Sequence, residues 1–346
     1  MTRIVVTAGA RTAITGWHRA QADISAHELA ATTFAAMPKD PEMVMLGNTI
    51  GPGGNIARIA ALAAGWQSAG AITFDAQCGS GLVAVGQALA HAKLTGQTVV
   101  AGGAESPSTA WPDGHRTQAA FTPQGFADPD MTTAADQLAA EFGLTRAEQE
   151  AYAAQSHQRA LDHPSEFIIG RHRDDGPRNV QRLLGRLAPV TNDQTATVTG
   201  LAAARIADAA AAIQLAPATG TRDIGVEILD YRMVGADPAR PGLAAAPAIT
   251  KLLTDHNLQV TDIAVLDIIE AYAAQVLAVC QQLGLDPAKI NARGGALAHG
   301  HPWAASGTIG LLTTIEQLST APTGTLGVTG AAIAGGMGVA VLAKTL

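Results

Sequence analysis

One cysteine stands at a predicted junction between a strand and a helix, where it could act as a nucleophile. Cys78 follows the β-branched and aromatic run 71–74, and Gly79 and Gly81 behind it permit a tight turn. Apolar residues then recur at helical spacing in 82–89. At a helix N-terminus the unpaired N–H groups and the helix dipole favour an anion, so we expect Cys78 to form a reactive thiolate. The alternative is a small buried side chain without chemistry.

A nucleophilic thiolate usually has a base beside it, and His301 is the candidate among ten histidines. It lies in the turn Gly300-His301-Pro302. A loop histidine with a structural role is the alternative, because the sequence alone does not show that His301 and Cys78 are close. His299 and His301 also form an H-x-H pair. Without further ligands at a known spacing this is a weak metal signal, and we expect no metal site.

The segment around Cys78 belongs to a regular alternation of strands and helices. Such an alternation predicts an α/β fold with a mostly parallel sheet covered by helices on both faces. Ser25 and Glu28 have the spacing of a capping box, which marks a helix start. The predicted elements of this first part are strands over about 1–8, 43–46, 71–74 and 98–103, and helices over about 25–37, 55–65 and 79–96.

A similar alternation returns after about Thr221. The glycine-rich turn 332–338, between two closing strands, would let backbone amides approach a ligand. Both halves carry strand, glycine-rich turn, helix and strand, so the pattern indicates a duplicated architecture. The predicted elements of this second part are strands over 263–269, 324–329 and 339–343, and helices over about 270–283 and 304–318.

Residues 106–198 differ in character from the two halves. They are richer in proline and charge and their strand signals are weaker, so we expect an inserted, loop-rich domain. One helix is predicted in it, from the capping box Thr145-Arg146-Ala147-Glu148 to about Leu161. The predicted domains are an N-terminal half over 1–105, completed by about 199–222, the insertion over 106–198, and a C-terminal half over 223–346.

Composition limits the classes of partner. Hydrophobic residues make up 47% and charged residues 15% of the 346 residues, as in a soluble globular protein. The net charge of −7 argues against a nucleic-acid or anionic-membrane surface, and no apolar run reaches the ~18 residues of a membrane span. Two cysteines cannot build a disulfide framework, so we expect a reducing cytoplasm, with Cys280 packed in a helix.

A loose basic stretch lies inside the predicted insertion of this acidic protein. It is either a solvated surface or a site for a phosphorylated ligand. The residues concerned are Arg171, Arg173, Arg178, Arg182 and Arg186.

Several motifs occur in order and at sensible spacing over nearly the whole chain. They are Ala10-Arg11-Thr12, Gly47-Asn48 through Ala57-Arg58, Cys78-Gly79-Ser80-Gly81-Leu82, Ala101-Gly102-Gly103-Ala104-Glu105-Ser106, Gly294-Gly295-Ala296, Gly300-His301-Pro302, Ala305-Ser306-Gly307 and Gly335-Gly336-Met337-Gly338. As a set they resemble the thiolases, the acyl-CoA C-acyltransferases. Several motifs that agree are far more specific than any one of them.

The resemblance implies a thiolase fold, in which two similar βαβαβαββ halves form five layers, αβαβα, with a loop domain inserted in the first half. It also implies a homodimer or homotetramer, coenzyme A thioesters as substrates, a role in lipid metabolism and no covalently bound cofactor. By the same resemblance Cys78 would accept the acyl group and His301 would activate it. The backbone N–H groups of Cys78 and Ala334 would hold the oxyanion.

Three positions depart from the family pattern. Ala332 stands where the family has a second cysteine that transfers a proton, which alanine cannot do. Ile269 replaces the asparagine of the Asn-Glu-Ala-Phe motif, which positions a water, and Ala204 replaces a serine beside the pantetheine of CoA. His299 is our candidate for a substitute acid or base, because an extended backbone would send residues two apart to the same side.

The residues keep the acyl-transfer half of the family mechanism and alter the carbon-acid half. We therefore expect an acyl-CoA acyltransferase that works through a Cys78 thioester and is weak in the carbon-acid step. One alternative is a condensing or acyl-transfer enzyme with an acceptor other than acyl-CoA and a partner protein, and another is a non-catalytic binding subunit. The residues expected to contact CoA are Arg171, Arg173, Arg178, Arg182 and Ala204.

Overall fold

The computed structural model describes residues 2–38, 40–113, 119–218 and 224–346. Its strands are β1 (Ile4–Arg11), β2 (Thr15–Gly16), β3 (Met43–Gly47), β4 (Gly70–Phe74), β5 (Val99–Glu105), β6 (Ala207–Pro217), β7 (Val226–Gly235), β8 (Val265–Ile268), β9 (Leu326–Ile333) and β10 (Met337–Thr345). Its helices are α1 (Ala26–Phe34), α2 (Ile56–Ala63), α3 (Ser80–Thr95), α4 (Pro107–Ala110), α5 (Met131–Glu141), α6 (Arg146–Asp162), α7 (Ala245–Asp255), α8 (Ala273–Leu283), α9 (Ala296–His299) and α10 (Trp303–Leu318).

The strands form two sheets that meet at a narrow seam. The strand order is β4-β3-β5-β6-β1-β7-β10-β9-β8, and β1 and β7 share a single residue pair, Val5 with Glu227. In the first sheet β3 pairs in parallel with both β4 and β5, while β6 runs antiparallel between β5 and β1. In the second sheet β8 and β9 are parallel and β10 is antiparallel to both of its neighbours. The sheets are therefore mixed, with parallel pairs only toward their outer ends. The prediction of a mostly parallel sheet was wrong, because β6, β1, β7 and β10 pair antiparallel in the middle.

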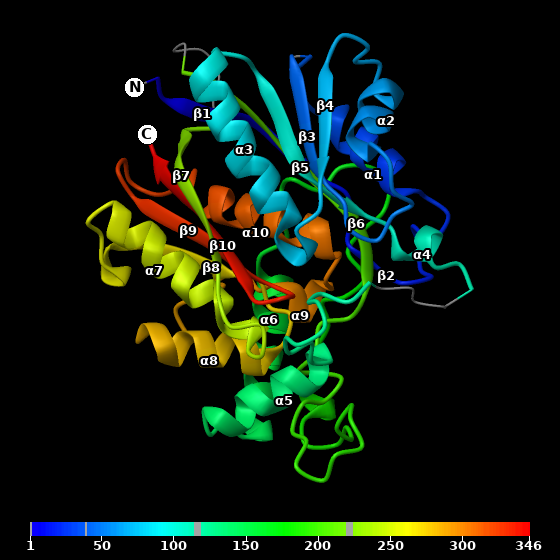
Figure 1. Cartoon of the computed structure of the whole chain (residues 1–346), viewed down its shortest axis with the longest axis vertical. Coiled ribbons are helices and arrows are strands. Elements are labelled where there is room, and N and C mark those ends of the chain that lie inside the picture. The colour runs from blue at the N-terminus through cyan, green and yellow to red at the C-terminus, as the bar shows by residue number, and fades with distance from the viewer. Residues whose placement is uncertain (1, 39, 114–118, 219–223) are drawn as a thin grey trace.

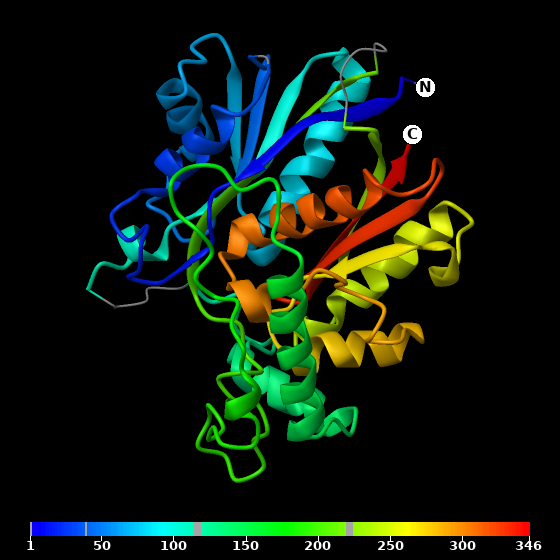
Figure 2. The ribbon, with the colours of Figure 1, turned by 180° about the vertical axis from the view of Figure 1, so that it is seen from behind.

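Buried side chains fall into three large clusters, one for each layer of helices. One cluster packs α1 and α2 on the first sheet, and another packs α7 and α8 on the second. The third lies between the two sheets and is filled by α3 and α10 (Figure 1 and Figure 2). This arrangement is helix, sheet, helix, sheet, helix. It confirms the predicted αβαβα layering, and each sheet is covered on both faces as its apolar strands require.

The local signals in the sequence match the helix ends that they predicted. Thr145 and Glu148 form the capping box at the start of α6, and Gly96 ends α3 in the left-handed conformation. Four described helices were not predicted from the sequence, namely the four-residue α4 and α9 and the longer α5 and α7. Asp130 caps α5 by accepting hydrogen bonds from two backbone N–H groups, which is a signal the sequence contained. Helix α7 begins at Ala244 without a side-chain cap, so it offered no comparable signal.

The two halves differ in one strand. The first half has β4 between α2 and α3, whereas no strand lies between α8 and α10 among the described residues. Asn291 occupies the corresponding place. Its side chain accepts a hydrogen bond from the N–H of Ile268 and donates one to the carbonyl of Ile268, at 2.7 and 2.8 Å. A side-chain amide thus supplies the pairing that a strand would give to β8.

The insertion reaches back to the first half through a buried ion pair. Arg11, at the end of β1, donates two hydrogen bonds to Asp174 at 2.8 and 2.7 Å. The segment contains α4, α5 and α6, and β6 then returns the chain to the first sheet. The predicted boundary between 222 and 223 lies outside the described residues.

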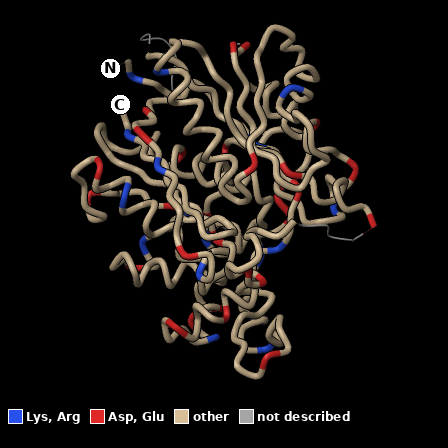
Figure 3. The backbone as a smooth tube through the Cα atoms, viewed as in Figure 1, with Lys and Arg blue, Asp and Glu red and all other residues tan. Residues whose placement is uncertain are grey.

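Charged residues of both signs are scattered over the molecule (Figure 3). Among the described helices, none combines the length and the apolar character that crossing a membrane requires. Cys280 is fully buried in α8 within the outer core, as predicted for a packing residue.

Candidate active site

Cys78 lies in a sharp turn between β4 and α3. The turn Gln77–Gly79 is a short 3-10 helix, and Gln77 adopts a φ of 48°, a conformation that side chains rarely take. Ser80 fixes the turn, because its Oγ accepts a hydrogen bond from the N–H of Ala76 at 2.8 Å and donates one to the carbonyl of Gln77 at 2.7 Å. The strained turn therefore presents the cysteine at the start of α3, as the sequence predicted.

Two glycines beside Cys78 are required by close packing. A Cβ on Gly79 would lie 2.3 Å from Ile333 Cδ1, and one on Gly81 would lie 2.5 Å from Thr308 Oγ1. Ile333 belongs to β9 and Thr308 to α10, so both contacts come from the C-terminal half. The glycines thus let the cysteine turn press against the other half of the molecule.

The structure brings His301 to Cys78. The distance from His301 Nε2 to Cys78 Sγ is 3.1 Å, although 223 residues separate them. The second ring nitrogen, Nδ1, lies 2.7 Å from the Oγ of Ser306 in α10. The N–H of His301 donates to the carbonyl of Arg205 at 2.8 Å, which fixes the backbone of the turn. When the thiol donates to Nε2, Nδ1 carries the ring proton and donates it to Ser306.

Burial opposes the thiolate that a helix N-terminus favours. Burial, followed by the charge of Glu105, raises the pKa of Cys78 to about 12. Burial also lowers the pKa of His301 to about 4. The helix N-terminus favours an anion, but here desolvation outweighs it. Both shifts favour the neutral thiol and the neutral imidazole over the charged pair, so we expect the thiolate to form as the proton moves to His301.

Glu105 is a fully buried carboxyl group at the end of β5, close behind the cysteine turn. Its oxygens accept hydrogen bonds from the Asn48 side chain at 2.8 Å and from the backbone N–H groups of Thr49, Ile50 and Ala304. Burial raises the pKa of Glu105 to about 8 despite these donors. The group ties β3, β5 and α10 together beneath the site.

Cys78 and His301 open into a cavity of about 220 Å³, which we call the cysteine cavity. Its wall is mostly apolar and is supplied by the insertion as well as by both halves. Besides Cys78 and His301, the residues that line it include Asp130, Thr132, Ala204, Tyr272, Gln275, Ala332 and Ala334.

Besides His301, the cavity contains two of the other three positions carried over from the family in the C-terminal half. Ala332 and Ala334 line it, and Ala334 precedes Gly335 and Gly336, whose φ values of 80° and 77° shape a tight turn. Ile269 does not line this cavity. It is 8% exposed, belongs to the central core and faces Gly310 of α10, where a Cβ would lie 2.7 Å from its Cδ1. The side chain of Ile269 therefore packs against α10 and does not face the substrate cavity.

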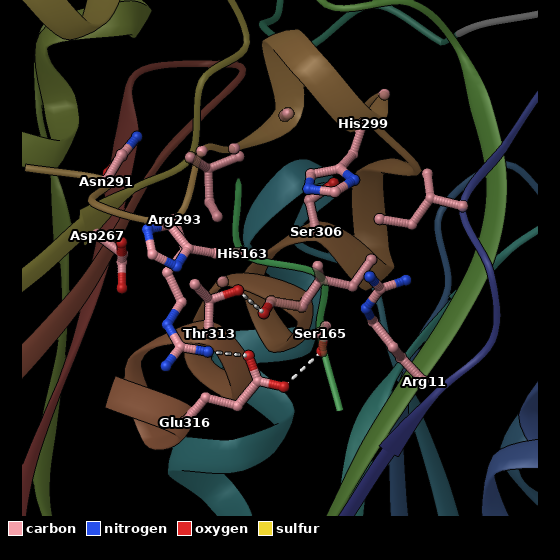
Figure 4. Close-up of a pocket in the computed structure, with 18 of the residues that line it drawn as sticks. Arg11, His163, Ser165, Asp267, Asn291, Arg293, His299, Ser306, Thr313 and Glu316 are labelled. Atoms are coloured by element: carbon pink, nitrogen blue, oxygen red, sulfur yellow. Dashed lines mark hydrogen bonds and ion pairs between the residues drawn. The ribbon is translucent and has the colours of Figure 1, made fainter. Parts of the chain in front are cut away.

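His299 faces a second, smaller cavity of about 50 Å³ (Figure 4). Its Nδ1 lies 3.1 Å from Asp174 Oδ2, in the ion pair with Arg11. Burial alone would raise the pKa of Asp174, but hydrogen bonds from Arg11 and His299 lower it below its usual range. The argument that put His299 and His301 on the same side was wrong, because α9 ends at His299 and the chain turns at Gly300, where φ is 117°.

Of the five residues predicted to contact CoA, one lines the cysteine cavity and four do not. Ala204 lines the cysteine cavity, and its N–H donates to the carbonyl of Ala271 at 2.9 Å. The four predicted arginines do not line the cavity and are exposed at the surface of the insertion, namely Arg171, Arg173, Arg178 and Arg182. The geometry therefore favours the solvated-surface interpretation for these side chains.

Sequence reasoning assigned no role to Ser306, Glu105, Tyr272 or Gln275. Ser306 lies in the motif Ala305-Ser306-Gly307 and Glu105 in the motif 101–106, so the motifs indicated both positions. The motifs did not indicate which residues the two side chains contact. Within the described ranges no group of three or more His, Cys, Asp or Glu side chains is arranged to hold a metal ion.

Comparison with known proteins agrees with this geometry. The chain matches the models of the thiolase N-terminal domain over residues 4–219 and the thiolase C-terminal domain over residues 223–345. A relative from Bacillus subtilis (strain 168), YhfS, provisionally named an acetyl-CoA C-acetyltransferase, is 36% identical over 321 residues, covering 88% of this chain and 87% of the relative.

Two solved structures share the whole fold. The dimeric peroxisomal thiolase of Saccharomyces cerevisiae has a TM-score of 0.90 and 28% identity, with 100% of this chain and 98% of that chain covered. The Acat5 thiolase of Ascaris suum, solved in complex with coenzyme A, has a TM-score of 0.86 and 25% identity, with coverages of 99% and 100%. From its motifs, its layered fold and these matches, the chain belongs to the thiolase family.

Proposed function

We propose that this protein transfers acyl groups from CoA thioesters through a thioester on Cys78, with His301 as the base. The observation that carries the proposal is the 3.1 Å contact between Cys78 Sγ and His301 Nε2 in the wall of the cysteine cavity. The name of the Bacillus subtilis relative and the coenzyme A in the Ascaris suum structure support CoA thioesters as the substrate class.

Acylation starts from the neutral pair. Cys78 Sγ attacks the thioester carbonyl while its proton moves to His301 Nε2, so the imidazolium forms only during the reaction. The backbone N–H groups of Cys78 and Ala334 stabilise the oxyanion of the tetrahedral intermediate. When the intermediate collapses, the C–S bond to CoA breaks, the CoA sulfur takes the proton from His301, and the acyl group stays on Cys78. Ser306 Oγ holds the ring so that Nε2 faces the sulfur.

The second half-reaction depends on the acceptor. A thiol acceptor needs only the reverse of these steps, with His301 again taking and returning a proton. A carbon acceptor must also lose a proton from its α-carbon, and the alanine at position 332 cannot take it. Loss of a general acid or base costs ~10² to 10⁴ in rate, so we expect acyl exchange between thiols to be much faster than Claisen condensation.

The proposal is tested by mixing the protein with acetyl-CoA and measuring the intact mass. We expect a mass increase of one acetyl group in the native chain and none in Cys78→Ala. An unchanged mass, or an adduct that persists in Cys78→Ala, would overturn acylation at Cys78. Alkylation by iodoacetamide is a weaker test, because the raised pKa of Cys78 makes the resting thiol slow to react even in an active enzyme.

A second candidate is a condensing enzyme whose acceptor is not an acyl-CoA and whose missing proton-transfer group comes from a partner protein. The observation that favours it is Ala332, which leaves a small side chain in the cavity wall where a proton-transfer group is expected in the family. It predicts acylation of Cys78 without thiolysis of 3-ketoacyl-CoA. Rapid thiolysis by the isolated chain would exclude this candidate.

We also propose that the chain forms a homodimer or a larger homo-oligomer, as the yeast thiolase is described to be dimeric. Among the described strands β4 is an edge that pairs only with β3, and its Ile72 is 43% exposed. Ile59 and Leu62 of the neighbouring helix α2 are exposed as well. An apolar edge of this kind is normally covered by a partner. Light scattering on the native chain and on Ile72→Lys tests this, and a monomeric native chain would contradict it.

A further inference from the structure

One polar side chain in the wall of the cysteine cavity has no part in the proposed reaction. Gln275 is the third residue of α8 and is 3% exposed. Neither the nitrogen nor the oxygen of its amide has a hydrogen-bond partner in the part of the chain that the structure describes. The stem of the side chain packs on Gly242, where an added Cβ would lie 3.0 Å from Gln275 Cγ. Packing thus holds the residue in the wall while its amide stays unpaired.

Several other polar groups of the wall have partners. Cys78 and His301 contact each other, and the Oγ1 of Thr132 lies 3.0 Å from the hydroxyl of Tyr272. Asp130 accepts hydrogen bonds at the start of α5. Of the polar side chains that line the cavity among the described residues, only His301 and Gln275 are buried. A buried amide without partners is unfavourable, so a group that binds it gains the hydrogen bonds that the free protein lacks.

We propose that Gln275 hydrogen-bonds a neutral polar group of the thioester substrate and selects substrates that carry such a group. The inference rests on the proposed function, because it takes an acyl-CoA as the ligand. A carboxamide offers a donor and an acceptor together, and a hydroxyl or a secondary amide can complement both. A carboxylate can only accept, and it would enter a cavity that already contains the carboxylate of Asp130. A plain hydrocarbon chain would leave the amide of Gln275 unpaired.

Two parts of an acyl-CoA can supply this group. A hydroxyl can come from the acyl chain, and an amide can come from the pantetheine arm, which every CoA thioester carries. The two sources have different consequences. Pairing with the acyl chain favours one class of acyl group, whereas pairing with the arm favours all CoA thioesters equally.

The test measures binding without chemistry. In a Cys78→Ala background, calorimetry gives the Kd of acetyl-CoA, butyryl-CoA and 3-hydroxybutyryl-CoA before and after Gln275→Met, which keeps the length of the side chain but removes both hydrogen bonds. We expect Gln275→Met to weaken binding by about 10- to 100-fold for the ligand that supplies the group. Weakening of 3-hydroxybutyryl-CoA alone assigns the acyl chain, and equal weakening of all three ligands assigns the pantetheine arm. Kd values within about twofold for all three would overturn the proposal.

Gln281 provides a matched control. It lies in the same helix, is exposed and does not line the cavity, so Gln281→Met should leave every Kd unchanged. Should Gln275→Met fail to fold, Gln275→Glu keeps the shape and an acceptor while it loses the donor, and the same criteria apply to it.

The outcome separates this inference from the proposed function. Suppose that Cys78 is acylated in the native chain but the Kd values do not change in Gln275→Met. Only the inference about Gln275 is then overturned. Binding that depends on Gln275, combined with no acylation of the native chain, overturns the acyl-transfer chemistry and leaves the inference standing.

Discussion

The two cavities lie on either side of Ser306 and treat their histidines differently. Ser306 lines the smaller cavity, and its Oγ contacts the ring of His301, which lines the cysteine cavity. Among the described residues the ring nitrogens of His301 contact only a thiol and a hydroxyl, and burial lowers the pKa of the ring, so a neutral imidazole that can accept a proton is favoured. His299, two residues earlier, faces the carboxylate of Asp174 beside Arg11. The partners on other elements, and not the residue type, decide which histidine can work as a base.

The same contrast extends to the rest of each wall. In the smaller cavity Glu316 forms an ion pair with Arg293 and accepts a hydrogen bond from the hydroxyl of Ser165 (Figure 4). In the cysteine cavity the amide of Gln275 has no partner among the described residues. Cys78 and His301 contact each other and line the space that a substrate would occupy. Paired groups stabilise the fold, whereas unpaired groups are available for binding and chemistry. Substitutions in the two cavities should therefore change different properties.

The largest expected effect is on acylation by His301→Ala. Without the base, the thiol with its raised pKa cannot lose its proton, so acetylation of Cys78 should slow by ~10² to 10⁴. Rapid-quench mass spectrometry measures this rate. His299→Ala is the matched control and should keep the rate within about threefold. Equal losses in both variants would show that the two histidines do not differ as their contacts indicate.

Arg11→Met should act on stability instead. It leaves the buried carboxylate of Asp174 without its strongest partner, which typically costs ~3 to 5 kcal/mol in the free energy of unfolding. Urea denaturation measures the loss, and acylation by the protein that remains folded should be nearly unchanged. Arg240→Met removes only exposed pairs, with Glu141 and Asp237, and should lower the free energy of unfolding far less than Arg11→Met does. A fully stable Arg11→Met variant would contradict the role of the ion pair.

Ser306→Ala should have an intermediate effect on the rate. It removes the partner of His301 Nδ1 and leaves that nitrogen buried without a hydrogen bond, so we expect acylation to fall by about tenfold. Ser306→Thr retains the hydroxyl and should recover most of the rate. Failure of the threonine variant to recover activity, in a protein of native stability, would point to packing and not to the hydrogen bond.

The smallest effect concerns pH. Since burial lowers the pKa of His301 to about 4, the neutral base is present far below its ordinary pKa of 6.5. The initial rate of acylation should therefore change little between about pH 5 and 8. The unfolded chain binds this proton below 6.5 and the folded chain only near 4, so His301 contributes stability that is complete above 6.5 and is lost as pH falls toward 4. A rate that halves near pH 6.5 would contradict the buried, neutral imidazole.

Much of the fold followed from local signals. The capping box at Thr145 fixed the start of α6, and Gly96 fixed the end of α3, because caps satisfy backbone groups within a few residues. Helix α7, without a side-chain cap, was not predicted. The missing strand of the second half was not predicted either, because Asn291 replaces it through its side chain.

The site was predictable in part. Glycines around Cys78 and the motif around His301 marked both residues, and the resemblance to the thiolases linked them. The exposed position of the four arginines was one of the two interpretations left open by the sequence, whereas the separate cavity of His299 had no local signal. Both depend on which segments cover a side chain, and those segments are far away in the sequence.

The sequence by itself determined the strand–helix alternation around Cys78, the nucleophile turn and the family, since periodicity, caps and motifs act over short distances, but it did not predict β6, β7, α5 or α7. Only the tertiary structure decided the protonation state of Cys78, the separate environments of His299 and His301, and the unpaired amide of Gln275. Each of these depends on desolvation and on contacts between residues far apart in the chain, and such terms exist only once the layers have packed.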